Sequence, residues 1–158
     1  FMTTKKDIPK QQQTAISGEH HSPLELTIQR IPFCQSVDGK MRTLKMRTGI
    51  TPNILARMGF ALSLEEPGTP QDPFDSEEPG RDINRGTLLG EYDAAYVALL
   101  RTWVAETDWL TQNDLLGECS TDQFNDLFVA HMNRGFELLS ARMRDLPGLG
   151  NLLATVNP

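Results

Sequence analysis

The chain lacks several features that would assign it to a common functional class. Its 158 residues include two cysteines and three histidines, too few for a disulfide framework or a cysteine-based zinc cluster. No run approaches the roughly 20 apolar residues of a membrane-spanning helix, and no signal-peptide pattern stands near the N-terminus. There is no glycine-rich phosphate loop, zinc-ligand spacing or nucleophile elbow. We therefore expect reduced thiols, no cofactor, no metal site, no membrane contact and a cytoplasmic location.

The charge is distributed unevenly along the chain. The formal net charge is -6, and 39% of the residues are hydrophobic. Residues 29–58 hold six basic side chains and one acidic one, a net charge of +5, so the remaining residues sum to -11. The acidic total argues against a protein that coats nucleic acid generally. A local basic patch can still bind phosphate, because charges within about 10 Å set the field near a surface.

The length fits one domain with flexible ends. Residues 1–23 are polar and predict a disordered tail, since they offer too little apolar area to fold. A compact helical domain is expected over residues 24–146, followed by a C-terminal tail over residues 147–158. The fold class is predicted to be mainly α, with about four helices and a short N-terminal strand or extended arm. Alternating apolar residues from Leu24 to Ile28 predict that arm, which should end near Pro32.

The first predicted helix has a cationic outer surface. Ser36 is a suitable N-cap, and Val37, Met41 and Leu44 share an apolar face at helical spacing. The basic side chains that flank this face are Lys40, Arg42, Lys45 and Arg47. Lysine and arginine hold phosphates with little reading of base sequence, so this helix favours nucleic acid. A cationic face that only keeps the protein soluble is the alternative.

A tight turn should separate this helix from an apolar one. Gly49 stands where a helix C-terminus turns left-handed, Thr51 can cap the next helix, and Pro52 fits its first position. The second helix, over residues 52–64, carries apolar residues on two faces. It should therefore be buried on two sides, one against the first helix and the other against later helices or another subunit. This strand–helix–turn–helix order resembles ribbon-helix-helix DNA-binding proteins, which dimerise through that unit.

Two further helices are expected after an acidic, proline-rich loop over residues 65–82. The third spans residues 84–107 and carries a long aromatic and aliphatic stripe. Residues 108–119 form a connector with a possible helical turn. The fourth helix begins at a capping box over residues 120–123 and runs to about residue 146. Gly135 lies on its apolar face and suggests a close helix crossing.

Few residues suggest catalysis. His131 is the only histidine in a predicted helix, and a lone histidine on an apolar face is usually a core residue. A metal-dependent nuclease would need several converging carboxylates. The carboxylates available to such a site are those of Glu65, Glu66, Glu91 and Asp93, provided that the fold brings them together.

Four blocks of the sequence resemble one protein family. They read RTGITPNIL at residues 47–55, FALSLEEPG at 60–68, NRGTLLGEYDAAYVALLR at 84–101 and HMNRG at 131–135. In this order they resemble DndE, the small component of the bacterial DNA phosphorothioation system. The resemblance covers roughly residues 24–144 and leaves both tails outside.

The resemblance implies a role in replacing a non-bridging phosphate oxygen of DNA by sulfur. It also implies partners: a cysteine desulfurase, an iron–sulfur enzyme and an ATPase-like protein. DndE proteins are associated with DNA, notably nicked duplex, and have been described both as oligomeric binders and as nicking enzymes. No catalytic motif can be transferred to this chain. The DNA-contact candidates are Lys40, Arg42, Lys45, Arg47 and Arg57.

Three functions are therefore open. The first is a DNA-binding component that holds the phosphate backbone at nicked duplex and forms a homo-oligomer through its second helix. The second is a DNA nicking endonuclease that opens the backbone for sulfur incorporation. The third is an assembly subunit without direct DNA contact, whose basic patch meets an acidic partner.

Overall fold

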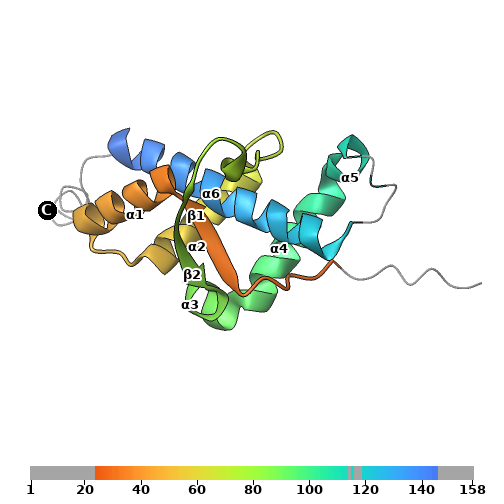
Figure 1. Cartoon of the computed structure of the whole chain (residues 1–158), viewed down its shortest axis with the longest axis horizontal. Helices are drawn as coiled ribbons and strands as arrows, with labels where there is room; N and C mark the ends of the chain where they lie inside the picture. Colours follow the sequence, from red (N-terminus) through yellow and green to blue (C-terminus); the bar gives the residue numbers. More distant parts are fainter. Residues whose placement is uncertain (1–23, 114, 116–118, 146–158) are drawn as a thin grey trace, which may run out of the picture.

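The computed structural model describes residues 24–113, 115 and 119–145, so the predicted tails 1–23 and 147–158 lie outside the described residues. The elements in chain order are β1 (Arg30–Cys34), α1 (Gln35–Thr48), α2 (Pro52–Glu65), the 3₁₀ turn η1 (Pro73–Asp75), β2 (Pro79–Asn84), α3 (Arg85–Leu89), the 3₁₀ turn η2 (Gly90–Tyr92), α4 (Asp93–Glu106), α5 (Trp109–Gln112) and α6 (Thr121–Asp145) (Figure 1). The mainly α fold class is confirmed. Within the described ranges, four helices have 14 residues or more, as expected.

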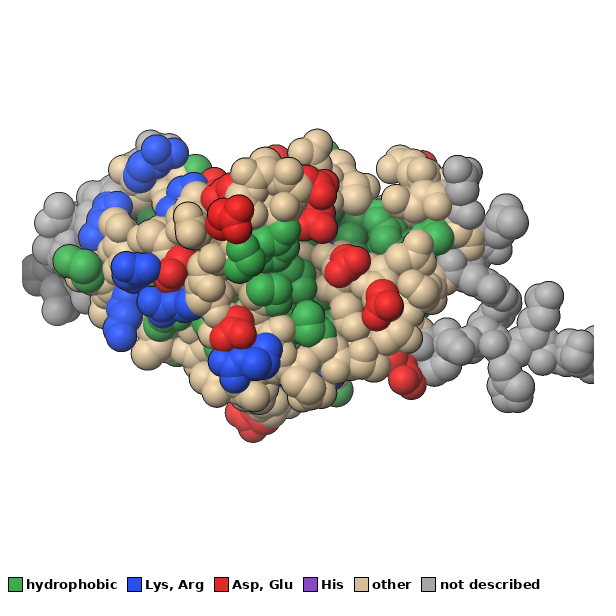
Figure 2. Space-filling view, in the orientation of Figure 1, with side chains coloured by type: hydrophobic (Ala, Val, Ile, Leu, Met, Phe, Trp, Pro, Cys, Tyr) green, Lys and Arg blue, Asp and Glu red, His purple; other side chains and the backbone are tan. Residues whose placement is uncertain are grey.

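The surface divides by charge. Figure 2 shows lysine and arginine side chains gathered mostly at the end of the molecule that carries α1, whereas most charged side chains on the rest of this face are aspartate or glutamate. Across the described residues, no helix has the length and apolar character that crossing a bilayer requires.

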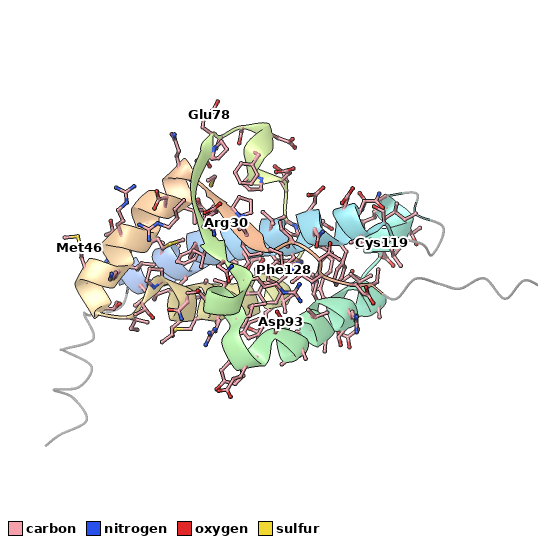
Figure 3. The ribbon with its side chains drawn as sticks, turned by 60° about the horizontal axis from the view of Figure 1, so that its bottom comes forward. Arg30, Met46, Glu78, Asp93, Cys119 and Phe128 are labelled. Atoms are coloured by element: carbon pink, nitrogen blue, oxygen red, sulfur yellow. The ribbon has the colours of Figure 1, made fainter. Side chains whose placement is uncertain are left out.

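The long helix α6 is the element on which α1, α2 and β1 pack. Its start is the predicted capping box: the Gln123 N–H donates to Ser120 Oγ (3.1 Å), and the Ser120 N–H donates to Gln123 Oε1 (2.9 Å). Phe124, Phe128 and Phe136 along α6 are fully buried, and Figure 3 shows Phe128 in the middle of the molecule. Each such side chain contributes roughly 1.5–3 kcal/mol on burial, so α6 supplies much of the core.

The crossing of α2 and α6 depends on two glycines. A Cβ placed on Gly135 would lie 2.3 Å from the backbone carbon and oxygen of Gly59, and one on Gly59 would lie 2.7 Å from those of Gly135. Neither backbone can accept a methyl group at that separation, so the helices meet as closely as glycine allows. The close crossing predicted from Gly135 is confirmed.

The expectation that α2 is buried on two sides is wrong for one of them. Leu55, Ala56 and Phe60 are fully buried, whereas Ile54 and Met58 are 45% and 44% exposed. The reason is that α2 packs mainly on α6 through its glycine face and contacts α1 much less. A second apolar face is therefore left at the surface.

The turn between α1 and α2 forms as predicted. Gly49 adopts a left-handed conformation with φ 71°, and its N–H donates to the Lys45 carbonyl (2.8 Å). Pro52 begins α2 as predicted, and Thr51 occupies the N-cap position. The predicted cap by its side chain is wrong, because the Thr51 hydroxyl donates to Asn53 Oδ1 (2.5 Å) and accepts from no N–H of α2. The predicted cap at Ser36 is wrong, because α1 begins two residues earlier than that cap implies, at Gln35 after Cys34. Instead the Glu77 carboxylate accepts from the Ser36 N–H (3.0 Å) and hydroxyl (2.9 Å) at this helix N-terminus.

Of the two forms predicted for the N-terminal segment, a short strand or an extended arm, the arm is present, and a strand follows it. The alternating residues 24–28 form an extended arm without strand pairing, and β1 begins at Arg30 and includes Pro32. Proline is tolerated there because its missing N–H belongs to the edge of β1 that faces away from β2. On that edge the side chain of Asn133 accepts from the Cys34 N–H (3.0 Å) and donates to the Pro32 carbonyl (3.1 Å).

The ribbon is formed within one chain. β1 pairs antiparallel with β2, with Ile31 opposite Ile83. The strand–helix–turn–helix order is therefore present. However, β1 pairs with β2 of the same chain rather than with β1 of a second copy. The prediction that residues 65–82 form only an exposed acidic loop is wrong in this respect, because β2 and η1 lie largely inside it. Charged residues in β2 conceal the alternation that marks a strand.

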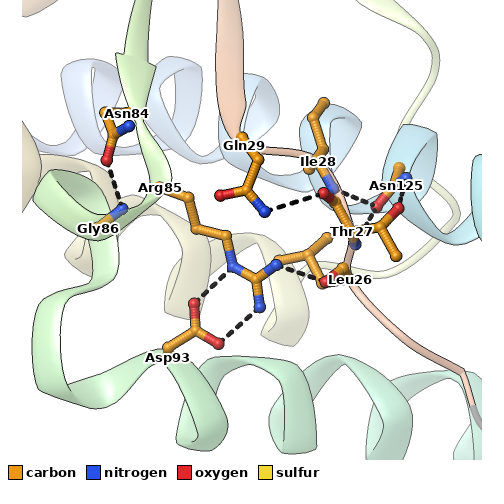
Figure 4. Close-up of polar contacts among 9 residues, drawn as sticks. All are labelled: Leu26, Thr27, Ile28, Gln29, Asn84, Arg85, Gly86, Asp93 and Asn125. Carbon is orange, nitrogen blue, oxygen red and sulfur yellow. Dashed lines mark hydrogen bonds and ion pairs between the residues drawn. The ribbon is translucent and has the colours of Figure 1, made fainter.

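The arm before β1 is held by polar side chains from distant elements (Figure 4). Asn125 of α6 accepts from the N–H groups of Thr27 (3.0 Å) and Ile28 (3.2 Å). Arg85 donates to the Leu26 carbonyl and forms a bidentate pair with Asp93, at 2.5 and 2.7 Å. The arm is thus part of the domain. The guanidinium of Arg85 is used in these contacts within the protein.

The single helix predicted over residues 84–107 is broken. α3 ends at Leu89, the next residue, Gly90, has φ 55°, and α4 begins at Asp93 after the turn η2. A side chain at this φ would be strained, so glycine permits the break. Along the predicted stripe, Leu88, Leu89 and Leu100 are buried, whereas Tyr92 and Leu99 are 49% and 47% exposed.

A buried polar group links α2 and α6 beside the glycine crossing. The Arg134 Nε–H donates to Ser63 Oγ (2.8 Å), and Ser63 Oγ lies 2.9 Å from His131 Nδ1. Ser63 Oγ therefore joins the guanidinium of Arg134 to the imidazole ring of His131, all within α2 and α6. Burial, followed by the nearby charge of Arg134, lowers the pKa of His131 to about 3. His131 is therefore a neutral core residue, as its pattern indicated.

Replacing Gly135 by alanine should destabilise the protein by several kcal/mol, because the new methyl group meets the backbone of Gly59. Gly39→Ala is the matched control, since a Cβ at Gly39 of α1 meets nothing within 4 Å and alanine favours a helix by about 1 kcal/mol. Thermal unfolding followed by circular dichroism should show a large loss for the first variant and none for the second. Equal melting temperatures for the two variants would contradict the close crossing.

The neutral state of His131 predicts a pH dependence. The folded pKa of about 3 lies below the ordinary value near 6.5 in the unfolded chain. The unfolded state therefore binds the extra proton between these values, and stability falls as the pH drops below 6.5, by about 1.4 kcal/mol per pH unit. His131→Asn keeps a hydrogen-bonding partner for Ser63 but does not titrate. Urea unfolding at pH 7, 6 and 5 should show a shallower loss for this variant; an identical slope would refute the assignment.

Candidate nucleic-acid interface

The cationic surface of α1 arises from its amphipathic pattern. Val37, Met41 and Leu44 are buried against the core, together with the carboxylate residue Asp38, and the basic side chains of the helix lie outside this face. The four basic residues predicted on this helix all lie on α1, and three of them, Arg42, Lys45 and Arg47, are exposed. The structure thus brings these four together on one surface.

Lys40 and Arg42 have acidic partners within the chain. Lys40 Nζ lies 2.6 Å from the Glu137 carboxylate of α6, and 34% of its side chain is exposed. Arg42 is 65% exposed and bonds Asp38 one turn earlier, at 2.9 Å. Arg81 of β2 bonds the same carboxylate at 2.7 Å. The Arg42 hydrogen bond, with help from Arg81, lowers the pKa of Asp38. Asp38 therefore stays ionised and neutralises part of the local positive charge.

Lys45 and Arg47 are the most available cations on α1. Both are exposed in its last turn, where the negative end of the helix dipole favours them. Within the described residues neither forms an ion pair, although Arg47 Nη2 donates to the Met143 carbonyl (3.3 Å). Their charge therefore faces solvent.

The basic surface also includes residues that sequence reasoning did not select. The Arg47–Met143 contact joins the end of α1 to the last turn of α6, where Arg142 and Arg144 are exposed. Basic residues in a final helical turn are a visible sequence signal. What the sequence could not show is that α1 and α6 end at the same end of the molecule (Figure 1).

Arg57 is set apart from this group. It lies half-buried on α2, where its Nε–H donates to the Leu88 carbonyl (2.7 Å). Its guanidinium also lies 5.4 Å from the centre of the Tyr92 ring, a cation–π contact. These contacts tie Arg57 to the α3–η2 segment rather than to the surface of α1.

The carboxylates considered for a nuclease do not converge. Asp93 is paired with Arg85, and no group of three or more His, Cys, Asp or Glu side chains among the described residues is arranged to hold a metal ion. His131, buried between α2 and α6, has no access to a substrate. The chemistry that this arrangement supports is the binding of an anionic polymer at the α1–α6 end.

Comparisons with known proteins agree with this fold. The chain resembles the crystal structure of DndE from Escherichia coli B7A, described as involved in DNA phosphorothioation modification, with a TM-score of 0.55 and 23% identity. It also resembles a glycine-to-lysine mutant of DndE involved in DNA phosphorothioation, with a TM-score of 0.51 and 22% identity. Each match covers 73% of this chain and 99% of the other. No curated protein matched the chain.

The solved structures are too low in identity to assign a family by themselves, and the match to a family model makes that assignment. The model for DndE, a DNA sulphur modification protein, matches residues 30–145. This match begins at β1, ends at the last residue of α6 and spans well over half of the sequence. The resemblance noted from four sequence blocks is thereby confirmed: the chain belongs to the DndE family and is a component of the DNA phosphorothioation system.

Proposed function

We propose that this chain binds DNA within the phosphorothioation machinery and contacts the phosphate backbone, with nicked duplex as its preferred form. The observation that carries the proposal is the cationic end of an otherwise acidic molecule, defined here as the basic end: Arg42, Lys45 and Arg47 of α1 with Arg142 and Arg144 of α6. All five are exposed. Lys40 and Arg57 are held by Glu137 and by Leu88, so we assign them secondary roles.

The physical basis is electrostatic. Each cation that neutralises a phosphate releases condensed counterions, which makes binding strongly dependent on salt and nearly independent of base sequence. The net charge of -6 repels DNA from most of the surface. The protein can therefore bind DNA only when its basic end faces the duplex, and this requirement sets its orientation on the DNA. The cysteine desulfurase, the iron–sulfur enzyme and the ATPase-like protein are the partners proposed for the remaining surface.

The alternative functions receive less support. A nicking endonuclease would need groups that activate a nucleophile or a metal ion, and the described carboxylates and His131 are occupied, dispersed or buried. An assembly subunit that does not touch DNA would use the same basic end against an acidic protein. Direct measurement of DNA binding separates this possibility from the proposal.

Removing two cations from the basic end should weaken DNA binding. Lys45→Ala with Arg47→Ala removes two phosphate contacts, so the slope of log affinity against log salt should become shallower by about 1.8 on duplex DNA. The matched control adds two negative charges to exposed residues of α5, at the opposite end, as Thr111→Glu with Gln112→Glu. Both double variants lower the net charge by two. Fluorescence anisotropy on nicked and intact duplexes over a salt series measures the effect.

Only the Lys45/Arg47 variant should lose affinity. Equal losses in both variants would show that net charge alone governs binding and would overturn the assigned surface. Absence of DNA binding by the unaltered protein, together with co-purification with other components of the system, would favour the assembly role.

We further propose that the chain forms a homo-oligomer through the exposed apolar face of α2. Ile54 and Met58 lie one turn apart on that face and leave nearly half of their surface in water. Light scattering after size exclusion should give a mass above that of one chain, and Ile54→Glu with Met58→Glu should reduce it to one chain. An unchanged mass in the variant would contradict this interface; Leu99→Glu on α4 is the control.

A further inference from the structure

Met46 is the most exposed of the large hydrophobic side chains in the described part of the chain. It is 86% exposed, whereas the next, Tyr92, is 49% exposed. Figure 3 shows it projecting from the end of α1, away from the body of the molecule. A single exposed apolar side chain is ordinary on a protein surface. Its surroundings are what distinguish Met46.

Met46 stands among the cations of the basic end. Lys45 and Arg47 precede and follow it in the chain, about 100° to either side around the helix. Arg42 lies one turn earlier on the same face and is 65% exposed. On the next turn that face carries Gly49, which has no side chain to cover Met46. A polyanion drawn to these three cations is therefore brought against an uncovered apolar tip.

The favourable position for such an apolar side chain on DNA is between stacked base pairs. Apolar side chains of DNA-binding proteins, methionine included, insert between base pairs and unstack them at a cost of a few kcal/mol. The unbranched thioether of methionine adapts to an irregular gap. Where one strand is interrupted, part of the stacking is already lost, so the cost of insertion is smaller than in continuous duplex.

We propose that Met46 is a wedge that inserts between bases where a strand is broken and so determines a preference for interrupted duplex over continuous duplex. This inference rests on the proposed DNA binding by the basic end. It assigns separate tasks to neighbouring residues: Arg42, Lys45 and Arg47 supply affinity for any duplex, and Met46 discriminates between duplexes by the state of their stacking.

The test compares three duplexes of one sequence: intact, nicked, and with a one-nucleotide gap. Affinities are measured by anisotropy for the full chain and for Met46→Ala, Met46→Leu and Leu99→Ala. The last variant truncates an apolar side chain of similar size and 47% exposure on α4, at a distance from the basic end. A 2-aminopurine base beside the nick reports unstacking by its fluorescence.

The unaltered protein should bind nicked and gapped duplexes more tightly than intact duplex and should raise the 2-aminopurine signal. Met46→Ala should lose roughly tenfold in affinity for interrupted duplexes, the value of one buried methionine side chain, with intact duplex unchanged. Met46→Leu should retain most of the preference, and Leu99→Ala all of it. Melting curves verify that the variants fold.

Other outcomes separate the wedge from DNA binding itself. The wedge is overturned if Met46→Ala keeps the preference for interrupted duplex or loses affinity equally on all three duplexes. It is also overturned if the unaltered protein shows no such preference. In each case DNA binding by the basic end stands. If the unaltered protein binds none of the duplexes, the proposed function fails as well.

Discussion

The contact between Gly59 and Gly135 is the constraint on which the rest of the structure depends. It brings α2 against α6 at backbone distance, and this approach sets Ser63 beside His131 and Arg134. The position of α2 in turn fixes the turn at Gly49 and hence where α1 ends. Because α1 also packs on α6, the cations of both helices finish at the same end of the molecule. The basic end is thus a consequence of how closely two helices can approach.

Sequence patterns predicted the elements whose signals are local. The capping box at Ser120, the left-handed Gly49 and the first-turn Pro52 each depend on a few neighbouring residues, and each is found where expected. The stripe on α6 is equally local, because 3.6-residue periodicity persists along its 25 residues. These signals sufficed for the mainly α fold class and for the cationic face of α1.

The errors concern pairings between distant residues. β2 carries Arg81 and Asp82, so it lacks the apolar alternation that marks a strand. It is a strand because it pairs with β1, which is far away in the sequence. The second face of α2 has a core-like composition, yet Ile54 and Met58 remain 45% and 44% exposed. The candidate site was affected in the same way. Arg142 and Arg144 lie beside the end of α1, and Arg57 lies apart from it, because of contacts that only the assembled fold creates.

The Asn133 side chain at the edge of β1 has a consequence for how copies of the molecule can meet. A strand with an unpaired edge is a template on which another strand can extend the sheet. Asn133 occupies the amide and carbonyl that Cys34 and Pro32 would otherwise present. β2, at the other edge, opens with Pro79 and carries the charged residues Arg81 and Asp82, which discourage pairing. Both edges of the sheet therefore disfavour pairing with a further strand, which favours assembly through helix faces and side chains.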